Sequence, residues 1–302
     1  MRYQRLGKTS LSVSSLAYGM WRFAGTSVSV AQEKIECALA LGITLFDQAD
    51  VYGVDGGGSF GDSESLLGAV FQSAPSLREK MVLATKGGIV LGVPYDSSAS
   101  YIRNAVDSSL RRMNIDVIDL YQIHRPDMLT HPCELAKVLT SLREEGKIRE
   151  VGVSNYSPSQ LDALQHYLDF PIASHQPQFS CWHLEPLQNG LLDQCQKNDM
   201  TPLAWSPMAG GLLGVDIDSV SIQQNKRLHN LLSLLDEIAE EQSVSRMAVA
   251  LAWVLFHTSK AIPILGTQNI NRLKNSTDAF RVQFTRQSWY KILVASQGEA
   301  LP

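Results

Sequence analysis

The stretch Gly42-Ile-Thr-Leu-Phe-Asp-Gln-Ala-Asp-Val-Tyr-Gly53 decides how the rest of the sequence is interpreted. It starts with a short apolar run, 43–46, which predicts a fully buried strand. Asp47 stands where this strand ends, and Tyr52 follows five residues later. A buried carboxylate is costly unless a cation meets it, so we expect a lysine or arginine at the end of another strand.

Two later apolar runs end on residues of suitable chemistry. Lys86 closes the first of them and His124 closes the second. In a closed parallel barrel, the carboxyl ends of all strands face one mouth, where the active sites of this fold lie. Asp47, Lys86 and His124 would therefore converge at that mouth, and Tyr52 would lie over them in its loop.

The remaining sequence alternates apolar runs with amphipathic stretches. Strands are expected at 16–20, 43–46, 81–85, 117–123, 149–153, 172–175, 202–205 and 262–265. Helices are expected at 30–41, 63–71 with Ser63 as N-cap, 99–113, 133–144, 158–168 with Ser157 as N-cap, 186–198, 227–241, 245–256, 269–277 and 285–297. A hairpin at 2–14 would plug the bottom. This pattern predicts a single-domain (β/α)8 TIM barrel over 1–302, with an N-terminal hairpin and extra C-terminal helices.

The composition is that of an ordinary globular protein. The chain has 302 residues, 44% of them hydrophobic and 19% charged, which is enough to bury a large core. Its net charge of −4 and the lack of a basic block argue against nucleic-acid binding. No apolar stretch has the length of a membrane span, and residues 1–6 lack the apolar run of a signal peptide, so we expect a cytoplasmic protein. The cysteines, which show no metal-ligand spacing, are expected to be reduced and mostly buried: Cys37, Cys133, Cys181 and Cys195.

Four phrases of the sequence, in this order, resemble the motifs of the aldo-keto reductases. They are Phe46-Asp-Gln-Ala-Asp-Val-Tyr-Gly53, Ala84-Thr-Lys86, Ile123-His-Arg-Pro-Asp127 and Gly152-Val-Ser-Asn155. The resemblance extends from Gly19-Met-Trp21 to the region of Arg272. It favours a branch that includes bacterial oxidoreductases and the β-subunits of potassium channels. It implies that Asp47, Tyr52, Lys86 and His124 form the catalytic tetrad of this family.

These residue types suit the reduction of a carbonyl group. A phenol such as Tyr52 can donate the proton that the carbonyl oxygen needs, although its ordinary pKa is about 10. The nearby ammonium of Lys86 lowers that pKa by favouring phenolate, and Asp47 keeps the lysine charged. His124 can orient the substrate oxygen. Each residue also has a purely structural alternative. Asp47 and Lys86 could form a structural ion pair, Tyr52 could be a core aromatic whose hydroxyl caps a turn, and His124 could be a core histidine with its hydrogen bonds made.

The resemblance also implies a binding site for NADP(H). Ser154, Asn155 and Gln176 would hydrogen-bond the nicotinamide carboxamide, and Trp205 would stack on the nicotinamide ring. Other cofactor contacts are expected at Gly19, Met20, Trp21 and Asp47, at Ser206, Pro207, Met208, Gly210 and Leu212 around the pyrophosphate, and at Gly266, Thr267, Gln268, Arg272 and Asn275 around the adenosine 2′-phosphate.

The sequence departs from the family pattern at three of these places. His175 stands before Gln176 where many members have asparagine, and Trp205 stands where many have tyrosine. Gly266 replaces a lysine that many relatives carry in the phosphate pocket. The guanidinium of Arg272 can still bind a phosphate, so NADP(H) is favoured over NAD(H), which stays possible.

Two other patterns are interpreted as unrelated to the chemistry. Gly56-Gly-Gly-Ser-Phe-Gly61 fits the GxGxxG pattern of dinucleotide-binding Rossmann folds. In those folds the pattern lies in the turn directly after a strand, whereas here several residues separate it from the end of the strand expected at 43–46. We interpret it as a flexible loop over the site. Five histidines show no metal-ligand spacing, and no metal is expected: His131, His166, His183, His229 and His257. Most of these five are expected to lie on the solvated surface.

The sequence therefore predicts an enzyme that reduces a small-molecule aldehyde or ketone with NADPH. Trp21, Tyr52 and His124 are expected to contact the substrate. One alternative is a regulatory subunit on the same fold that binds NADP(H) with weak turnover. Another is a barrel hydrolase with paired carboxylates, although only Asp47 stands cleanly at a strand end.

Overall fold

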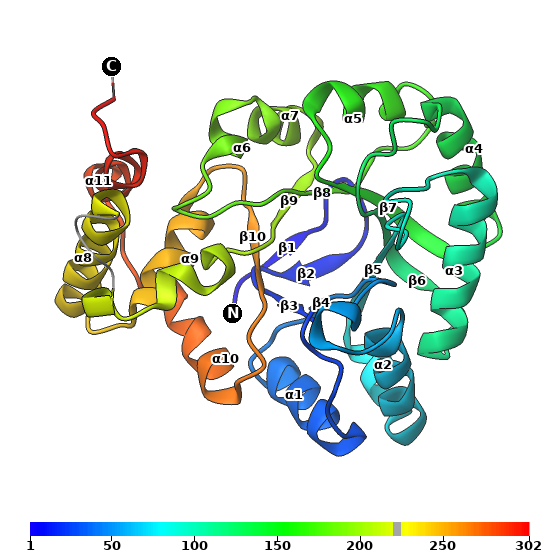
Figure 1. Ribbon diagram of the computed structural model, residues 1–302, viewed down its shortest axis with the longest axis horizontal. Coiled ribbons are helices and arrows are strands. Elements are labelled where there is room, and N and C mark those ends of the chain that lie inside the picture. The colour runs from blue at the N-terminus through cyan, green and yellow to red at the C-terminus, as the bar shows by residue number, and fades with distance from the viewer. Residues whose placement is uncertain (220–224, 302) are drawn as a thin grey trace.

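The computed structural model describes residues 1–219 and 225–301, and its centre is a closed barrel of eight parallel strands (Figure 1). In their order around the barrel these are β10 (Ile262–Leu265), β3 (Ala17–Gly19), β4 (Leu45–Asp47), β5 (Val82–Gly87), β6 (Ile118–Ile123), β7 (Ile148–Ser154), β8 (Ser174–Gln176) and β9 (Thr201–Ala204). The expected (β/α)8 fold is confirmed.

Helices surround the barrel on the outside (Figure 1). The α-helices are α1 (Val28–Ala40), α2 (Asp62–Ser73), α3 (Ala99–Met113), α4 (Pro132–Glu144), α5 (Pro158–Gln165), α6 (Glu185–Gln188), α7 (Leu191–Asn198), α8 (Lys226–Glu241), α9 (Arg246–Phe256), α10 (Ile270–Ser276) and α11 (Arg286–Gln297). Short 3-10 helices are η1 (Val54–Gly56), η2 (Pro75–Lys80), η3 (Ala209–Gly214), η4 (Ile217–Ser219) and η5 (Thr277–Phe280). Among the described residues, no helix has both the length and the apolar character needed to cross a membrane.

An antiparallel hairpin closes the bottom of the barrel, as expected. It consists of β1 (Tyr3–Arg5) and β2 (Ser12–Ser14). Leu6, which follows β1, and Val13, which lies within β2, are fully buried and belong to the apolar cluster inside the barrel. The backbone N–H of Gly7 donates to Thr201 Oγ1 at 2.8 Å, which ties the hairpin to the first residue of β9.

Helix α3 shows how the local sequence sets an element of the outer layer. Ser98 caps it by accepting a hydrogen bond from the N–H of Tyr101. Its buried positions recur at helical spacing and face the barrel, and they are Ile102, Ala105, Val106, Ser109 and Met113. The helix ends at Met113, and the C-cap Asn114 adopts a left-handed conformation with φ of 52°. The bounds agree with the expected range of 99–113.

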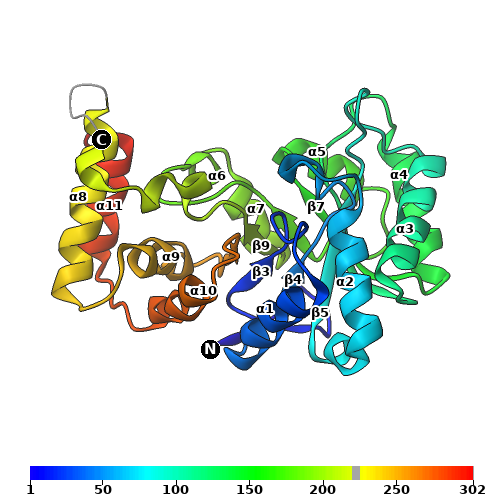
Figure 2. The same cartoon turned by 60° about the horizontal axis from the view of Figure 1, so that its bottom comes forward.

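The last helices form an addition to one side of the barrel. Figures 1 and 2 both show α8 and α11 side by side, away from the ring of helices that covers the strands. Trp289 on α11 stacks on Trp253 of α9, with ring centroids 4.7 Å apart and nearly parallel planes. This stacking joins the added pair to the barrel and confirms the expected extra C-terminal helices.

Three details of the expected elements were wrong. Ser63 does not cap α2, because the N-cap is Gly61 and the buried Ser63 hydroxyl donates to the carbonyl of Met20 at 3.0 Å. The expected helix 186–198 is divided into α6 and α7, since Gly190 between them adopts φ of 80°. The helix expected at 158–168 ends at Gln165. Most other boundaries shift by one or two residues.

Candidate active site

The four residues of the expected tetrad lie together at the mouth of the barrel. Asp47 ends β4, Lys86 lies near the end of β5, His124 directly follows β6, and Tyr52 lies in the segment after β4. Lys86 Nζ is 2.7 Å from Asp47 Oδ2 and 4.9 Å from the centroid of the Tyr52 ring. The rings of Tyr52 and His124 meet edge to face, with centroids 6.0 Å apart.

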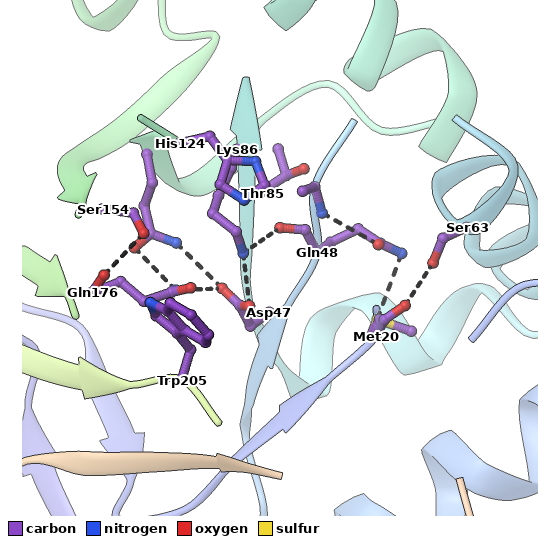
Figure 3. A network of polar contacts seen from close by, with 12 residues as sticks. Met20, Asp47, Gln48, Ser63, Thr85, Lys86, His124, Ser154, Gln176 and Trp205 are labelled. Carbon is purple, nitrogen blue, oxygen red and sulfur yellow. Dashed lines mark hydrogen bonds and ion pairs between the residues drawn. The ribbon is translucent and has the colours of Figure 1, made fainter. Parts of the chain in front are cut away.

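The Asp47–Lys86 ion pair is buried and well supplied with hydrogen bonds (Figure 3). Besides Asp47, the Lys86 ammonium donates to the backbone carbonyl of Gln48 at 2.9 Å. The second oxygen of Asp47 accepts from Gln176 Nε2 at 2.8 Å and from Gln122 Nε2 at 3.2 Å. The expectation that Asp47 would pair with a cation from the end of another strand is therefore confirmed by Lys86.

The environment shifts the pKa values of the Tyr52 phenol and the Lys86 ammonium. Burial raises the pKa of Tyr52 above its ordinary value, and the charge of Lys86 lowers it only part of the way back. The expectation that the lysine would leave Tyr52 with a lowered pKa is therefore corrected, because burial outweighs it. Burial alone would lower the pKa of Lys86, but Asp47 and Tyr52 together raise it, so the lysine is charged.

His124 is neutral at physiological pH. Burial lowers its pKa well below 6.5, and the charges of Lys86 and Arg125 lower it further. Arg125 is half-buried, with its guanidinium 5.9 Å from the centroid of the Trp205 ring. A neutral imidazole can donate one hydrogen bond without competing for the proton that a phenol would give.

The ends of β7, β8 and β9 form a continuous wall beside the tetrad. Ser154 Oγ donates to the carbonyl of Gln176 at 2.8 Å, and Asn155 Nδ2 donates to Ser154 Oγ at 2.7 Å. The indole N–H of Trp205 donates to Asn155 Oδ1 at 2.9 Å. These bonds orient the half-buried Trp205 ring next to Gln176. The structure thus brings together the four residues expected at the nicotinamide, whose contacts with it stay a prediction.

The segment after β9 is an unusual turn. Ser206 and Ala209 adopt left-handed φ values of 49° and 50°, and Gly210 and Gly211 follow with φ of 69° and 107°. Turns of this kind can gather backbone N–H groups around an anion. The other expected contacts differ in exposure, since Pro207 is buried while Met208 and Leu212 are half-buried.

The residues expected at the 2′-phosphate follow β10. Gly266, Arg272 and Asn275 are exposed, and Arg272 lies in the first turn of α10, where its N–H donates to the cap residue Asn269. Thr267 Oγ1 accepts from the N–H of Asn269 at 3.2 Å. Gln268 is fixed differently, because its amide oxygen accepts from the Tyr18 hydroxyl at 3.0 Å.

The expected contacts near the first strand are of two kinds. Gly19 lies within β3, where a Cβ atom would be only 2.7 Å from Ile264 Cγ2, and Met20 is fully buried in the core. The absence of a side chain at Gly19 thus lets Ile264 pack closely, and the Met20 side chain serves packing, while their contacts with the cofactor stay a prediction. Trp21 is 40% exposed, and its indole N–H donates to Asp55 Oδ2 at 2.6 Å. This bond joins the mouth to the glycine-rich segment, which lies in a loop before α2 and not in a turn directly after a strand.

Sequence reasoning missed the buried amide of Gln122, which lies in β6 and contacts both Asp47 and Gln176. A glutamine within the apolar run Ile118–Ile123 was the only local indication. The histidine assignment was partly right: His131 and His166 are exposed, while His183, His229 and His257 are half-buried. Within residues 1–219 and 225–301, no group of three histidine, cysteine or acidic side chains is arranged to hold a metal ion.

Comparison with known proteins agrees with this geometry. Residues 15–295 match the model of the aldo/keto reductase family. The chain is 44% identical to a 6-dehydroglucose reductase of Novosphingobium aromaticivorans, over 99% of this chain and 97% of that protein. It is 34% identical to the oxidoreductase YdhF of Escherichia coli, over 96% and 95% of the two chains.

A solved structure shows the same fold. The thermostable aldo-keto reductase Tm1743, crystallised with the inhibitor epalrestat, superposes with a TM-score of 0.81 at 23% identity, covering 98% of this chain and 100% of that one. The family match covers nearly the whole sequence, and the relatives match almost end to end. The chain therefore belongs to the aldo-keto reductase family.

Proposed function

We propose that this oxidoreductase uses NADPH to reduce the carbonyl group of an aldehyde or ketone to an alcohol. The observation that carries the proposal is the position of Lys86, whose ammonium lies between the Asp47 carboxylate and the Tyr52 ring, with the neutral His124 alongside. Tyr52 provides a proton donor, Lys86 a charge that stabilises the resulting phenolate, and His124 a hydrogen-bond donor that orients the substrate, all at the same mouth of the barrel.

Tyr52 is the proposed general acid. Its raised pKa keeps the phenol protonated at neutral pH, so a proton is available for the carbonyl oxygen. Lys86 stabilises the phenolate that remains, and Asp47 holds the lysine in place. His124 donates a hydrogen bond to the same substrate oxygen and orients it.

The residues beyond the tetrad fit a nicotinamide dinucleotide phosphate. Trp205 offers a half-buried aromatic face, and Gln176 offers a carboxamide next to it. The left-handed turn at Ser206–Gly211 suits a pyrophosphate. Arg272 is exposed and its guanidinium suits a 2′-phosphate. When bound, the dinucleotide supplies the hydride that the carbonyl carbon accepts.

The substrate that we propose first is a sugar with a terminal aldehyde. The relative with 44% identity is named for the reduction of 6-dehydroglucose. At the mouth of this chain, the exposed face of Trp21 can stack on a sugar ring. Arg22 lies over the same ring at 4.8 Å, and Asp55 accepts its indole N–H. Polar groups of both charges around an aromatic face are able to hydrogen-bond hydroxyl groups.

The experiment is an assay of NADPH consumption with 6-dehydroglucose and with hexanal, which has the same chain length and no hydroxyl groups. We expect turnover of both and a higher kcat/KM for the sugar. Tyr52→Phe keeps the ring, so it should bind NADPH normally and lose on the order of 10²–10⁴-fold in kcat. Near-normal turnover by Tyr52→Phe would show that another group donates the proton.

We also propose that the enzyme acts in the cytoplasm. All four cysteines are free thiols, with Cys181 and Cys195 buried and Cys37 and Cys133 half-buried. Unpaired cysteines suit a compartment that keeps thiols reduced. Recovery of the native protein in a periplasmic or membrane fraction of its own cells would contradict this location.

A further inference from the structure

Gln122 is a fully buried amide that the proposed reaction does not use. It lies on β6, with its side chain between Asp47 of β4 and Gln176 of β8. Its Nε2 donates to Asp47 Oδ1 at 3.2 Å, while its Oε1 accepts from Gln176 Nε2 at 3.3 Å. Gln122 thus bridges the ion pair and the glutamine that stands beside Trp205.

These contacts determine which end of the Gln176 amide faces Asp47. The Asp47 carboxylate, paired with Lys86, has only acceptor oxygens, so the atom 2.8 Å from Oδ1 must be the nitrogen of Gln176. The second hydrogen of that nitrogen is directed to Gln122 Oε1. Both donors of Gln176 are therefore engaged, and its oxygen has no partner among the described residues.

A glycine on the neighbouring strand leaves space beside Gln122. On the adjacent strand β7, the residue beside it is Gly152, where a Cβ atom would lie 3.0 Å from Gln122 Cγ and 2.3 Å from Ser174 Oγ. A side chain at 152 would therefore crowd the Cγ of Gln122 and, more severely, the hydroxyl of Ser174. The absence of a side chain at 152 is thus part of what lets Gln122 occupy this position, while its hydrogen bonds to Asp47 and Gln176 orient its amide.

We propose that Gln122 is a positioning residue that fixes the orientation of the Gln176 amide. With Gln122 and Asp47 occupying both N–H donors, Gln176 presents an oxygen to the cofactor (Figure 3 shows Gln176 beside Asp47 and Trp205). The site therefore recognises the NH2 group of the nicotinamide carboxamide as a donor. This inference rests on the proposed use of NADP(H).

The proposal predicts a measurable preference between two cofactors. In the 3-acetylpyridine analogue of NADP+, a methyl group replaces the carboxamide NH2, so the donor is lost while the carbonyl oxygen stays. The wild-type protein should bind NADP+ on the order of tenfold more tightly than this analogue, because one buried acceptor would be left unpaired. In Gln122→Met, Gln176 keeps only its hydrogen bond to Asp47 and loses the second one that fixes the plane of its amide, so the preference should fall below about threefold.

The test measures the dissociation constants of both oxidised cofactors by tryptophan fluorescence for the wild type and Gln122→Met. The matched control is Ser174→Ala, which also removes a buried polar side-chain atom next to Gly152. Unlike Gln122, the Ser174 hydroxyl has no hydrogen-bond partner among the described residues, so this variant should keep the wild-type preference. In Gln176→Met, the preference should be lost, and adding Gln122→Met to it should change nothing further. If Gln122→Met fails to fold, Gln122→Asn, which withdraws the same amide by one methylene, takes its place.

The outcomes separate this inference from the proposed function. A wild-type protein that binds neither cofactor would overturn the proposed use of NADP(H). A wild type that binds NADP+ with the expected preference, together with a folded Gln122→Met that keeps that preference, would overturn the positioning role alone. Loss of the preference in Gln122→Met and in Gln176→Met, with Ser174→Ala unchanged, would support it.

Discussion

Replacing Lys86 by methionine removes the cation from a fully buried ion pair. Asp47 would keep only the hydrogen bonds from Gln122 and Gln176. Breaking one side of a buried pair typically costs about 3–5 kcal/mol in the free energy of unfolding. The double variant with Asp47→Asn removes the unpaired charge as well, so it should recover much of that loss in urea titrations followed by circular dichroism.

The effect on catalysis follows from the position of the ammonium. Lys86 Nζ lies 4.9 Å from the centroid of the Tyr52 ring. At an effective dielectric constant of about 20, a unit charge at this separation favours the phenolate by about 3 kcal/mol. Since burial and Asp47 both raise the pKa of Tyr52, loss of the lysine raises it further. Oxidation of an alcohol by NADP+, which needs phenolate, should be slower by about a hundredfold at a fixed pH below that pKa.

The assay is the pH profile of alcohol oxidation for the wild type, Lys86→Met and the double variant with Asp47→Asn. Lys86→Met should move the rising limb of the rate toward higher pH. Its unpaired Asp47 pushes the phenol in the same direction, and the double variant separates the two causes because it carries neither charge. A folded Lys86→Met whose profile overlays that of the wild type would remove Lys86 from the mechanism.

Two further predictions concern cofactor choice and acid stability. Arg272→Ala should weaken NADPH binding on the order of ten- to a hundredfold while NADH binding stays nearly unchanged, and equal losses in a titration would assign Arg272 a structural role. His175 is fully buried, and burial lowers its pKa to about 4 from 6.5. Between these pH values the unfolded chain binds a proton that the folded protein does not, so stability falls as the pH drops, by up to about 3 kcal/mol for this residue. His175→Phe should reduce the loss of unfolding free energy between pH 7 and pH 4, and an unchanged slope would mean that His175 is not the group responsible.

The tetrad could be found from the sequence because each residue belongs to a local pattern. Asp47, Lys86 and His124 each close an apolar run, and parallel strands bring such ends together without any contact along the chain. The orientation of Gln176 could not be found in this way. It depends on Asp47 and Gln122, which lie 129 and 54 residues away, and a glutamine in a strand does not reveal its partners.

The helix boundaries show the same limit. Ser157 before α5 acts as the N-cap that the sequence predicts. Ser63 stands in a similar context at the start of α2, yet its hydroxyl donates to the carbonyl of Met20, which directly follows β3, and no local rule contains this contact. Tyr52 is a third case, because its pKa depends on burial as well as on the lysine that the motif identifies.

Stability alone does not account for the charged pair at the barrel mouth. A buried ion pair is often no more stabilising than apolar residues of the same volume, because desolvation offsets the attraction. Asp47, however, accepts hydrogen bonds from β5, β6 and β8 at once, through Lys86, Gln122 and Gln176. The single oxygen of an asparagine could not accept from all three strands, and it would not favour the charged form of the lysine. A carboxylate at the end of β4 is therefore what lets one side chain set both the charge beneath Tyr52 and the amide beside Trp205.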